Sequence, residues 1–210
     1  MTTSDALTLA REERADLLDL LTGLTPAQWE APSLCAGWRV RDVVAHMFSY
    51  EELGFGGLVG RFLRGRGRPD DVNAAALAAY ANRSTDDLVR LVQQHLQPRG
   101  ITAGFGGRIA LTDGLIHHQD IRRPLGLPRA IPAERLLTAL DFARTAPLIA
   151  AAKRIRGLKL VATDLDWTAG SGPVVEGPGE SLLMAIAGRR GTTAELTGPG
   201  QPTLGERIDA

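Results

Sequence analysis

Apolar residues recur at every third or fourth position over most of residues 1–155, which is the period of helices that bury one face. Two capping sequences, Thr25–Gln28 and Ser84–Asp87, mark helix starts, because their side chains can bond the free backbone amides of a first turn. The glycine-rich and arginine-rich residues 54–69 interrupt the pattern and predict a flexible connection. Helices are expected over residues 5–23, 39–53, 70–82, 85–96, 112–123 and 132–155, the last with room for a kink at Pro147.

The pattern changes after Gly157. Apolar and polar residues alternate from Leu158 to Thr168, which predicts a strand, and residues 174–176 are expected to pair back on it after a glycine-rich turn. A compact helix over residues 179–189 and a last amphipathic segment follow. We therefore predict a mainly α protein, with a four-helix bundle over residues 1–155 and a small α+β domain over residues 156–210.

Composition excludes several classes of partner. The 210 residues carry 24 basic and 24 acidic side chains, so the net charge is zero, which argues against nucleic acid as the main partner. No apolar run reaches the length of a membrane span, and the N-terminus lacks the pattern of a signal peptide. A single cysteine, Cys35, excludes an internal disulfide and suggests a reducing compartment. We expect a cytoplasmic protein that acts on small molecules; the oligomeric state stays open.

Chemistry is concentrated in the segment from Thr112 to Pro124. A helix turns by about 100° per residue, so Asp113, His117 and Asp120 lie on one stripe of an otherwise apolar face. Two interpretations stay open from this segment alone: a carboxylate and an imidazole that bind a metal, or an Asp–His hydrogen bond on a half-buried helix. His118 is rotated away from the stripe, toward the helix surface or a neighbouring helix.

A third metal ligand is available on another predicted helix. His46 lies on the flank of an apolar stripe, and bundle cores assemble sites from side chains on facing helices. Two imidazoles and one carboxylate, from His46, Asp113 and His117, make a three-ligand set with zinc as the default ion. Asp120 then orients an imidazole through its other nitrogen. A histidine such as His46 is more often structural.

Two further residues are expected to serve packing. His95 shares the apolar face of its predicted helix, and Cys35 has no base in the local sequence, although His46 could approach it in space. We therefore leave both outside the predicted metal site.

Three parts of the chain together resemble one family. Trp29 and the run from Cys35 to His46 (CAGWRVRDVVAH) resemble the N-terminal signature of the mycothiol-dependent maleylpyruvate isomerase family, part of the DinB-like group of metal-binding bundles. The run from Leu115 to Gly126 (LIHHQDIRRPLG) resembles its second motif. Asp164–Trp167 and Gly177–Arg189 resemble the C-terminal extension of actinobacterial members.

The resemblance implies a four-helix bundle with an up-down-down-up course. It also implies one divalent metal held by a histidine of the second long helix and by an acid and a histidine one turn apart on a later helix. These correspond to His46, Asp113 and His117. The family's acid is often glutamate, and Asp113 is one methylene shorter, so either the helix lies closer or the metal is held more weakly.

The activity that the resemblance implies uses mycothiol, a small-molecule thiol, as cosubstrate. We expect an enzyme that isomerises an electrophilic small molecule or transfers the thiol to it. A conjugated carboxylate substrate needs a cation, for which Arg189 is the candidate catalytic residue, with Arg190 and the arginines of residues 64–68 behind it. Two alternatives stay open: hydrolysis by metal-bound water at the same site, and a non-enzymatic metal-binding or ligand-binding module.

Overall fold

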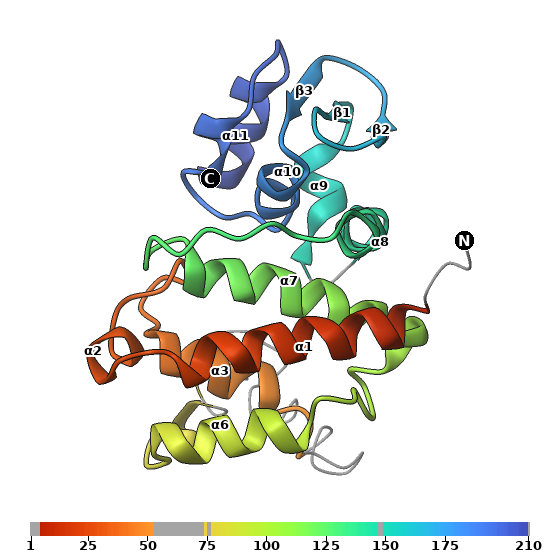
Figure 1. Cartoon of the computed structure of the whole chain (residues 1–210). Helices are drawn as coiled ribbons and strands as arrows, with labels where there is room; N and C mark the ends of the chain where they lie inside the picture. The colour runs from red at the N-terminus through yellow and green to blue at the C-terminus, as the bar shows by residue number, and fades with distance from the viewer. Residues whose placement is uncertain (1–4, 53–73, 75–76, 147–148, 210) are drawn as a thin grey trace. The chain divides into compact units, whose positions relative to one another are not determined.

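The computed structural model describes residues 5–52, 74, 77–146 and 149–209 (Figure 1). The chain forms two compact units, Met1–Pro128 and Arg129–Ala210. The described residues are mainly helical and contain a small three-stranded sheet near the C-terminus, which confirms the predicted fold class. The division falls after Pro128, whereas the sequence analysis set the domain boundary at residue 155. Among the described residues, no helix is long and apolar enough to cross a membrane.

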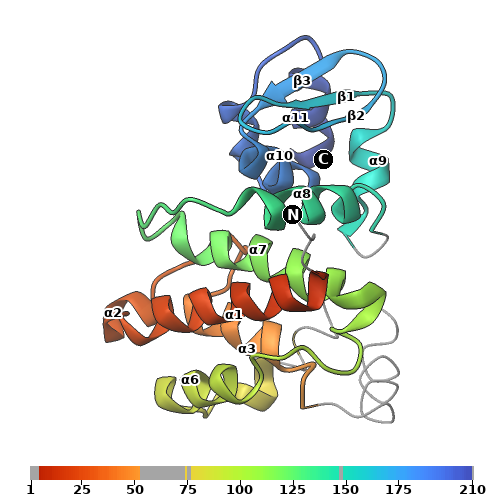
Figure 2. The ribbon, with the colours of Figure 1, turned by 45° about the vertical axis from the view of Figure 1, so that its right-hand side comes forward.

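Four helices of the first unit pack around a common core. Helix α1 contacts both α6 and α7, and α3 also contacts both, so the four form a bundle (Figure 1 and Figure 2). The core includes fully buried Leu17, Val44, Phe48 and Leu91. The elements of this unit are α1 (Ala6–Thr22), α2 (Pro26–Trp29), α3 (Val40–Phe48), α6 (Thr85–Gln94), the 3₁₀ turn η1 (Gly104–Gly107) and α7 (Arg108–Arg122).

Both predicted capping sequences are confirmed. The hydroxyls of Thr25 and Ser84 accept hydrogen bonds from the backbone N–H groups of Gln28 and Asp87, whose side chains bond back to the cap residues. The helix expected over residues 39–53 ends earlier, at Phe48. Of the helix expected over 70–82, residues 74 and 77–80 are described and helical. The predicted connection over 54–69, with its arginines, lies outside the described residues.

A glycine allows α7 to begin against the N-terminus of α1. Gly107 has a φ of +94°, and a Cβ there would lie 2.7 Å from the Cα atom of Leu7. Real Cβ atoms do not approach a backbone that closely, and the left-handed φ also favours glycine. The close approach places α7 along α1 and so sets the position of the segment that carries Asp113 and His117.

The second unit starts with two helices where one was expected. The predicted helix over residues 132–155 is divided into α8 and α9, and Pro147 lies outside the described residues. Helix α10 packs on α8. The elements are α8 (Ala133–Ala143), α9 (Ala151–Ile155), β1 (Lys159–Ala162), β2 (Thr168–Gly170), β3 (Val174–Gly177), α10 (Gly179–Ile186), the 3₁₀ turn η3 (Thr192–Glu195) and α11 (Gln201–Asp209).

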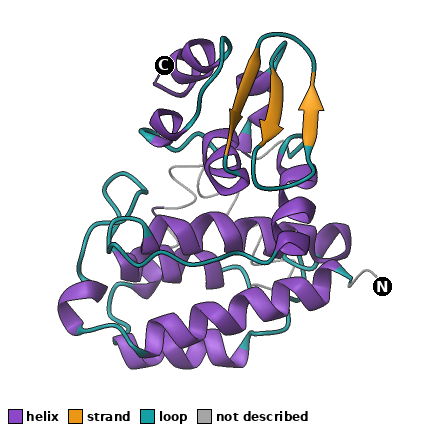
Figure 3. Ribbon diagram, turned by 45° about the horizontal axis from the view of Figure 1, so that its top comes forward, coloured by secondary structure: helices purple, strands orange, loops and turns teal. Residues whose placement is uncertain are grey.

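The sheet differs from the hairpin that alternation predicted. Strand β1 ends at Ala162, the chain turns, and β2 returns antiparallel to β1, so the expected strand over 158–168 is wrong beyond its first half. The expected pairing of residues 174–176 with this strand is confirmed, because β3 pairs with β1. It runs parallel to β1, on the edge opposite β2, in the order β2-β1-β3 (Figure 3). The connection from β2 to β3 needs glycine at position 172, because a Cβ there would lie 2.1 Å from the Gly157 carbonyl oxygen.

Candidate metal centre

Asp113 and His117 lie one turn apart on α7 and contact each other. Nε2 of His117 is 3.4 Å from Oδ1 of Asp113. The His117 side chain is 10% exposed, whereas that of Asp113 is 41% exposed. The pair therefore has a buried end and an accessible end, and a ligand can approach from the side of the carboxylate.

His46 meets this pair from α3. Its ring centroid lies 5.0 Å from that of His117, with the two rings at 75°. The ring of Trp38 also packs against that of His46, with the centroids 4.9 Å apart, and Tyr50 makes an edge contact at 5.7 Å. Aromatic contacts on several sides restrict the rotation of a ring. The orientation of His46 is thus fixed by the loop before α3 and by the residues after it.

The structure brings the three predicted ligands together. One donor atom from each of His46, Asp113 and His117 lies within 4.8 Å of the other two. Two imidazoles and a carboxylate form the donor set typical of a catalytic zinc site, which keeps a position open for water or substrate. The residues therefore fit a divalent cation; we call them the first ligand set. Ligation itself stays a prediction.

Asp120 holds the opposite side of the His117 ring. Its Oδ2 atom is 2.8 Å from Nδ1 of His117, and its side chain is fully buried. When Nδ1–H donates to this carboxylate, the lone pair of Nε2 is directed toward Asp113 and His46. This contact is the one that the predicted supporting role of Asp120 requires; the role stays a prediction.

The charges of the cluster favour a protonated His117 in the metal-free protein. Burial opposes the charged imidazole, but the Asp113 carboxylate and the hydrogen bonds to Asp113 and Asp120 outweigh burial and raise the pKa of His117 well above 6.5. Burial likewise acts against the Asp113 carboxylate, yet the charge of His117 and the hydrogen bond to it lower the pKa of Asp113. A metal that binds here must therefore displace a proton.

Sequence reasoning missed the surroundings of Cys35. Its Sγ atom donates to Oδ2 of Asp120 at 3.1 Å and lies 3.9 Å from Nδ1 of His117. Cys35 was expected to be a packing residue with His46 as the histidine that could approach, but its sulfur contacts His117 and Asp120. The loop is fixed there because the Leu34 N–H donates to the Asp120 carbonyl oxygen at 3.0 Å. A long-range contact of this kind leaves no signal in a single sequence.

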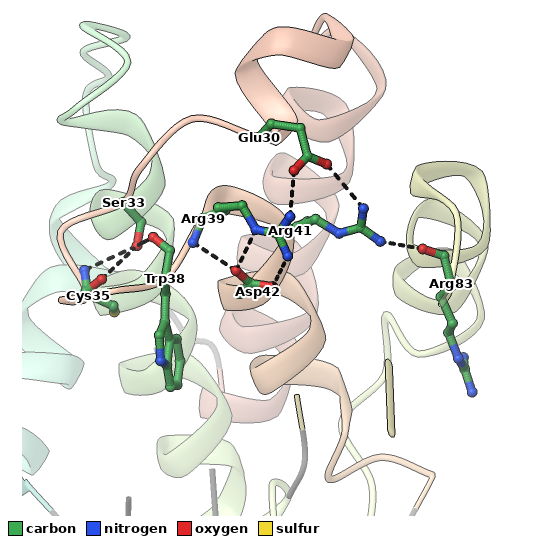
Figure 4. A network of polar contacts seen from close by, with 8 residues as sticks. All are labelled: Glu30, Ser33, Cys35, Trp38, Arg39, Arg41, Asp42 and Arg83. Carbon is green, nitrogen blue, oxygen red and sulfur yellow. Dashed lines mark hydrogen bonds and ion pairs between the residues drawn. The ribbon is translucent and has the colours of Figure 1, made fainter. Parts of the chain in front are cut away.

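The loop that carries Cys35 and Trp38 is itself well anchored. The Ser33 hydroxyl donates to the Trp38 carbonyl oxygen at 2.9 Å and accepts from the Cys35 N–H (Figure 4). At the start of α3, Arg39 and Arg41 both donate to the Glu30 carboxylate, as Figure 4 shows. The two arginines connect the start of the loop to α3, so the segment that carries Cys35 and Trp38 is held in place at both ends.

His118 lies on the other face of α7. It is fully buried, its Nδ1 atom is 2.8 Å from Oε1 of Glu13 on α1, and its Nε2 atom accepts from Nε of Arg122 at 2.8 Å. His118 was predicted to face either the helix surface or a neighbouring helix, and the structure confirms the neighbouring helix. The ring of His95 contacts the Leu91 carbonyl oxygen at the end of α6, as expected of a structural histidine.

The predicted catalytic cation belongs to the second unit. Arg189 follows α10 and donates to the Ala187 carbonyl oxygen. Its neighbour Arg190 lies near Asp209 at the end of α11. The catalytic role of Arg189 stays a prediction.

Comparison with known proteins gives one family and one fold. Residues 10–98 match the family described as the mycothiol maleylpyruvate isomerase N-terminal domain. The chain is also similar to a crystal structure of the mycothiol-dependent maleylpyruvate isomerase, with 16% identity, a TM-score of 0.54, and coverage of 93% of this chain and 92% of that chain. A histidine-to-alanine mutant of that enzyme matches at 15% identity, the same coverage and a TM-score of 0.50.

No curated protein matches the chain. The family match includes most of α1 and all of α2, α3 and α6, with Cys35 and His46, and it ends before α7. At 16% identity the structural likeness shows the fold alone. Residues 10–98 are thus similar to the mycothiol maleylpyruvate isomerase N-terminal domain, and the chain as a whole has the fold of the crystallised isomerase.

Proposed function

We propose that His46, Asp113 and His117 hold one divalent cation, with zinc as the default, and that this cation serves a reaction of a small-molecule thiol. The observation that supports the proposal is the convergence of three donor atoms from α3 and α7 within 4.8 Å of one another. A carboxylate that is 41% exposed gives the thiol a route to the site.

The thiol is proposed from the relationship to the isomerase. The crystal structure with the same fold is described as mycothiol-dependent, so a mycothiol-like thiol is the cosubstrate that we propose for this chain. A bound divalent cation lowers the pKa of a thiol and so supplies thiolate at neutral pH. A thiolate that adds to an electron-poor double bond allows rotation about the resulting single bond. Elimination then restores the thiol and gives the isomer, whereas retention of the new S–C bond gives S-transfer.

The chain's own residues orient and shield the reacting groups. Trp38 and Tyr50 hold the His46 ring, and Asp120 holds the His117 ring through Nδ1. A fixed orientation of each ligand lowers the cost of assembling the site, because little side-chain freedom is lost on binding. Arg189 is the cation that we propose for a carboxylate on the substrate.

Metal analysis tests the first part of this proposal. Purified wild-type protein is expected to carry about one divalent ion per chain. In a Cys35→Ser background, which removes the chain's single thiol, the His46→Ala variant is expected to lose this ion. His95→Ala is the matched control, because it removes a histidine of the same unit that contacts Leu91 and lies outside the ligand set. Wild-type protein that takes up no stoichiometric metal contradicts the proposal.

Calorimetric titration with a small-molecule thiol tests the second part. Thiol binding is expected in the metal-loaded protein and should disappear after chelation. The titration is repeated with Cys35→Ser, which removes the chain's single cysteine as a source of signal. Metal binding without thiol binding contradicts the thiol chemistry and favours a hydrolase or a binding module.

A further inference from the structure

We propose that Cys35, Asp120 and Nδ1 of His117 form a second ligand set, which binds a thiophilic divalent cation and competes with the first ligand set for His117. The inference goes beyond the proposed function and does not depend on thiol chemistry. It rests on a feature of the His117 ring: each of its two nitrogens faces a separate group of metal-ligating side chains.

The three donor atoms already have nearly the spacing that a metal requires. Sγ of Cys35 is 3.1 Å from Oδ2 of Asp120 and 3.9 Å from Nδ1 of His117, and Oδ2 is 2.8 Å from Nδ1. Around a tetrahedral zinc ion with ordinary bond lengths, neighbouring donors lie about 3.3–3.6 Å apart. The shifts needed are therefore a few tenths of an ångström for each pair.

The backbone holds these groups together before any ion arrives. Cys35 follows directly on Leu34, whose N–H donates to the carbonyl oxygen of Asp120, so the loop is fixed to the residue that supplies the carboxylate. The Ser33 hydroxyl accepts from the Cys35 N–H at 3.1 Å. Asp120 is fully buried, whereas Cys35 is only half-buried. A cation can thus enter from the side of the thiol and meet a preformed carboxylate–imidazole pair.

The donor types select the class of cation. Thiolate is a soft ligand that prefers zinc, cadmium and copper(I) to harder ions such as magnesium or manganese. The first ligand set has no sulfur and includes the part-exposed Asp113, so it does not share this preference. Cadmium is the clearest probe, because its bond to a thiolate gives a charge-transfer absorption that imidazole and carboxylate ligands lack.

Proton balance makes the two ligand sets exclusive. Oδ2 of Asp120 accepts from both the Cys35 thiol and Nδ1–H of His117. When a cation takes their place, the thiol proton and the Nδ1 proton both go to solvent, and the proton on Nε2 stays where it faces Oδ1 of Asp113. A neutral imidazole offers one lone pair, so His117 serves one ligand set at a time.

Cadmium titration followed by ultraviolet absorption tests the proposal. Wild-type protein is expected to develop one cadmium–thiolate band per chain, and Cys35→Ser none. Asp120→Asn is expected to weaken the cadmium binding that gives this band about tenfold or more, while circular dichroism checks that each variant is folded. A band with an unchanged midpoint in Asp120→Asn shows binding by the cysteine alone and overturns the second ligand set. The absence of a band in wild-type protein also overturns it.

The His46→Ala variant separates this inference from the proposed function. It lacks the first ligand set and keeps the second, so it is expected to retain the cadmium–thiolate band. Loss of the band in His46→Ala overturns a separate second set. Cadmium added to wild-type protein that holds one ion in the first ligand set is expected to displace that ion one for one. Two ions bound together in one chain overturn the competition for His117.

Discussion

The Oδ2 atom of Asp120 lies 2.8 Å from Nδ1 of His117, on the opposite side of the ring from Asp113. The three residues follow one another along a single face of α7, so one helix supplies two of the proposed metal ligands and the carboxylate proposed to support one of them. A ligand whose other nitrogen is held in this way loses little freedom when it binds. The contact between Asp120 and His117 is therefore the first point to test.

Asp120→Asn is expected to lower the metal affinity of the first ligand set about 10–100-fold, because the amide carries no charge to orient and polarise the imidazole. Chelator competition measures the affinity, in a Cys35→Ser background that removes the second ligand set. Asp19→Asn makes the same substitution at an exposed position of α1 and should leave the affinity unchanged. Equal affinities for Asp120→Asn and Asp19→Asn would show that Asp120 does not support the ligand.

Metal affinity is expected to rise with pH. The pKa of His117 is raised well above 6.5, so a proton competes with the metal for Nε2 at neutral pH. Affinity should increase up to the raised pKa and then level off. Calorimetry between pH 6 and pH 9, in buffers of different ionisation enthalpy, measures both the affinity and the proton released. Constant affinity over this range, with no proton release, contradicts a protonated His117 in the metal-free protein.

The stability of the metal-free protein should show the opposite trend. A group whose pKa is raised on folding stabilises the folded state fully below its unfolded pKa, and this contribution is lost as the pH rises through the folded pKa. For His117 the free energy of unfolding should therefore fall as the pH rises above about 6.5. Urea unfolding measures this slope, which should be reduced in His117→Gln and kept in the control His95→Gln. If the slope in His117→Gln equals that of the wild-type protein, the pH dependence of stability comes from other groups.

Gly107→Ala is expected to destabilise the first unit by more than the roughly 1 kcal/mol that a left-handed φ alone costs an alanine. The added methyl group would meet the backbone of Leu7 at 2.7 Å. Gly100→Ala is the matched control, because Gly100 has a φ of +56° and a Cβ there would have no neighbour within 4 Å. Thermal or urea unfolding compares the two. If both variants lose the same free energy of unfolding, α1 can shift away from the added methyl group without loss of stability.

Tryptophan fluorescence should report metal binding through Trp38. Its ring centroid is 4.9 Å from that of His46, so a cation on His46 changes the surroundings of the indole. The change should disappear in Trp38→Phe and persist in Trp167→Phe, which alters the second unit. Metal affinity, measured separately by calorimetry, should change only a few fold in Trp38→Phe, because a phenyl ring still packs on the imidazole. A fluorescence change that survives in Trp38→Phe contradicts binding next to His46.

Local patterns predicted the helices of the first unit well. The caps at Thr25 and Ser84 act within four residues of sequence, and the stripe from Asp113 to Asp120 follows from helix geometry alone. The sequence could also propose His46 as a partner, because its position on an apolar stripe directs it toward a bundle core. The aromatic neighbours of His46 and its distance to His117 could be learned only from the structure.

The remaining differences come from long-range contacts. The alternation of apolar and polar residues in the sequence continues through the turn between β1 and β2. Trp167 fits this alternation because it is buried, but it lies outside the strands, and its indole N–H donates to Asp141 of α8. The same contact, with the packing of α10 on α8, explains why α8 groups with the second unit. Cys35 reaches Asp120 through a loop contact between residues 86 positions apart, Leu34 and Asp120. Nothing in the local pattern encodes these pairings.

The two adjacent histidines of α7 face different helices, and this fixes the rotation of α7 about its own axis. His117 is directed to His46 of α3, and His118 to Glu13 of α1. An inserted or deleted residue within the helix turns everything beyond it by about 100°. Such a change before His117 would separate both histidines from their partners at once. The length of the helix from Gly107 to His118 is therefore as important to the proposed site as the side chains proposed to bind the metal.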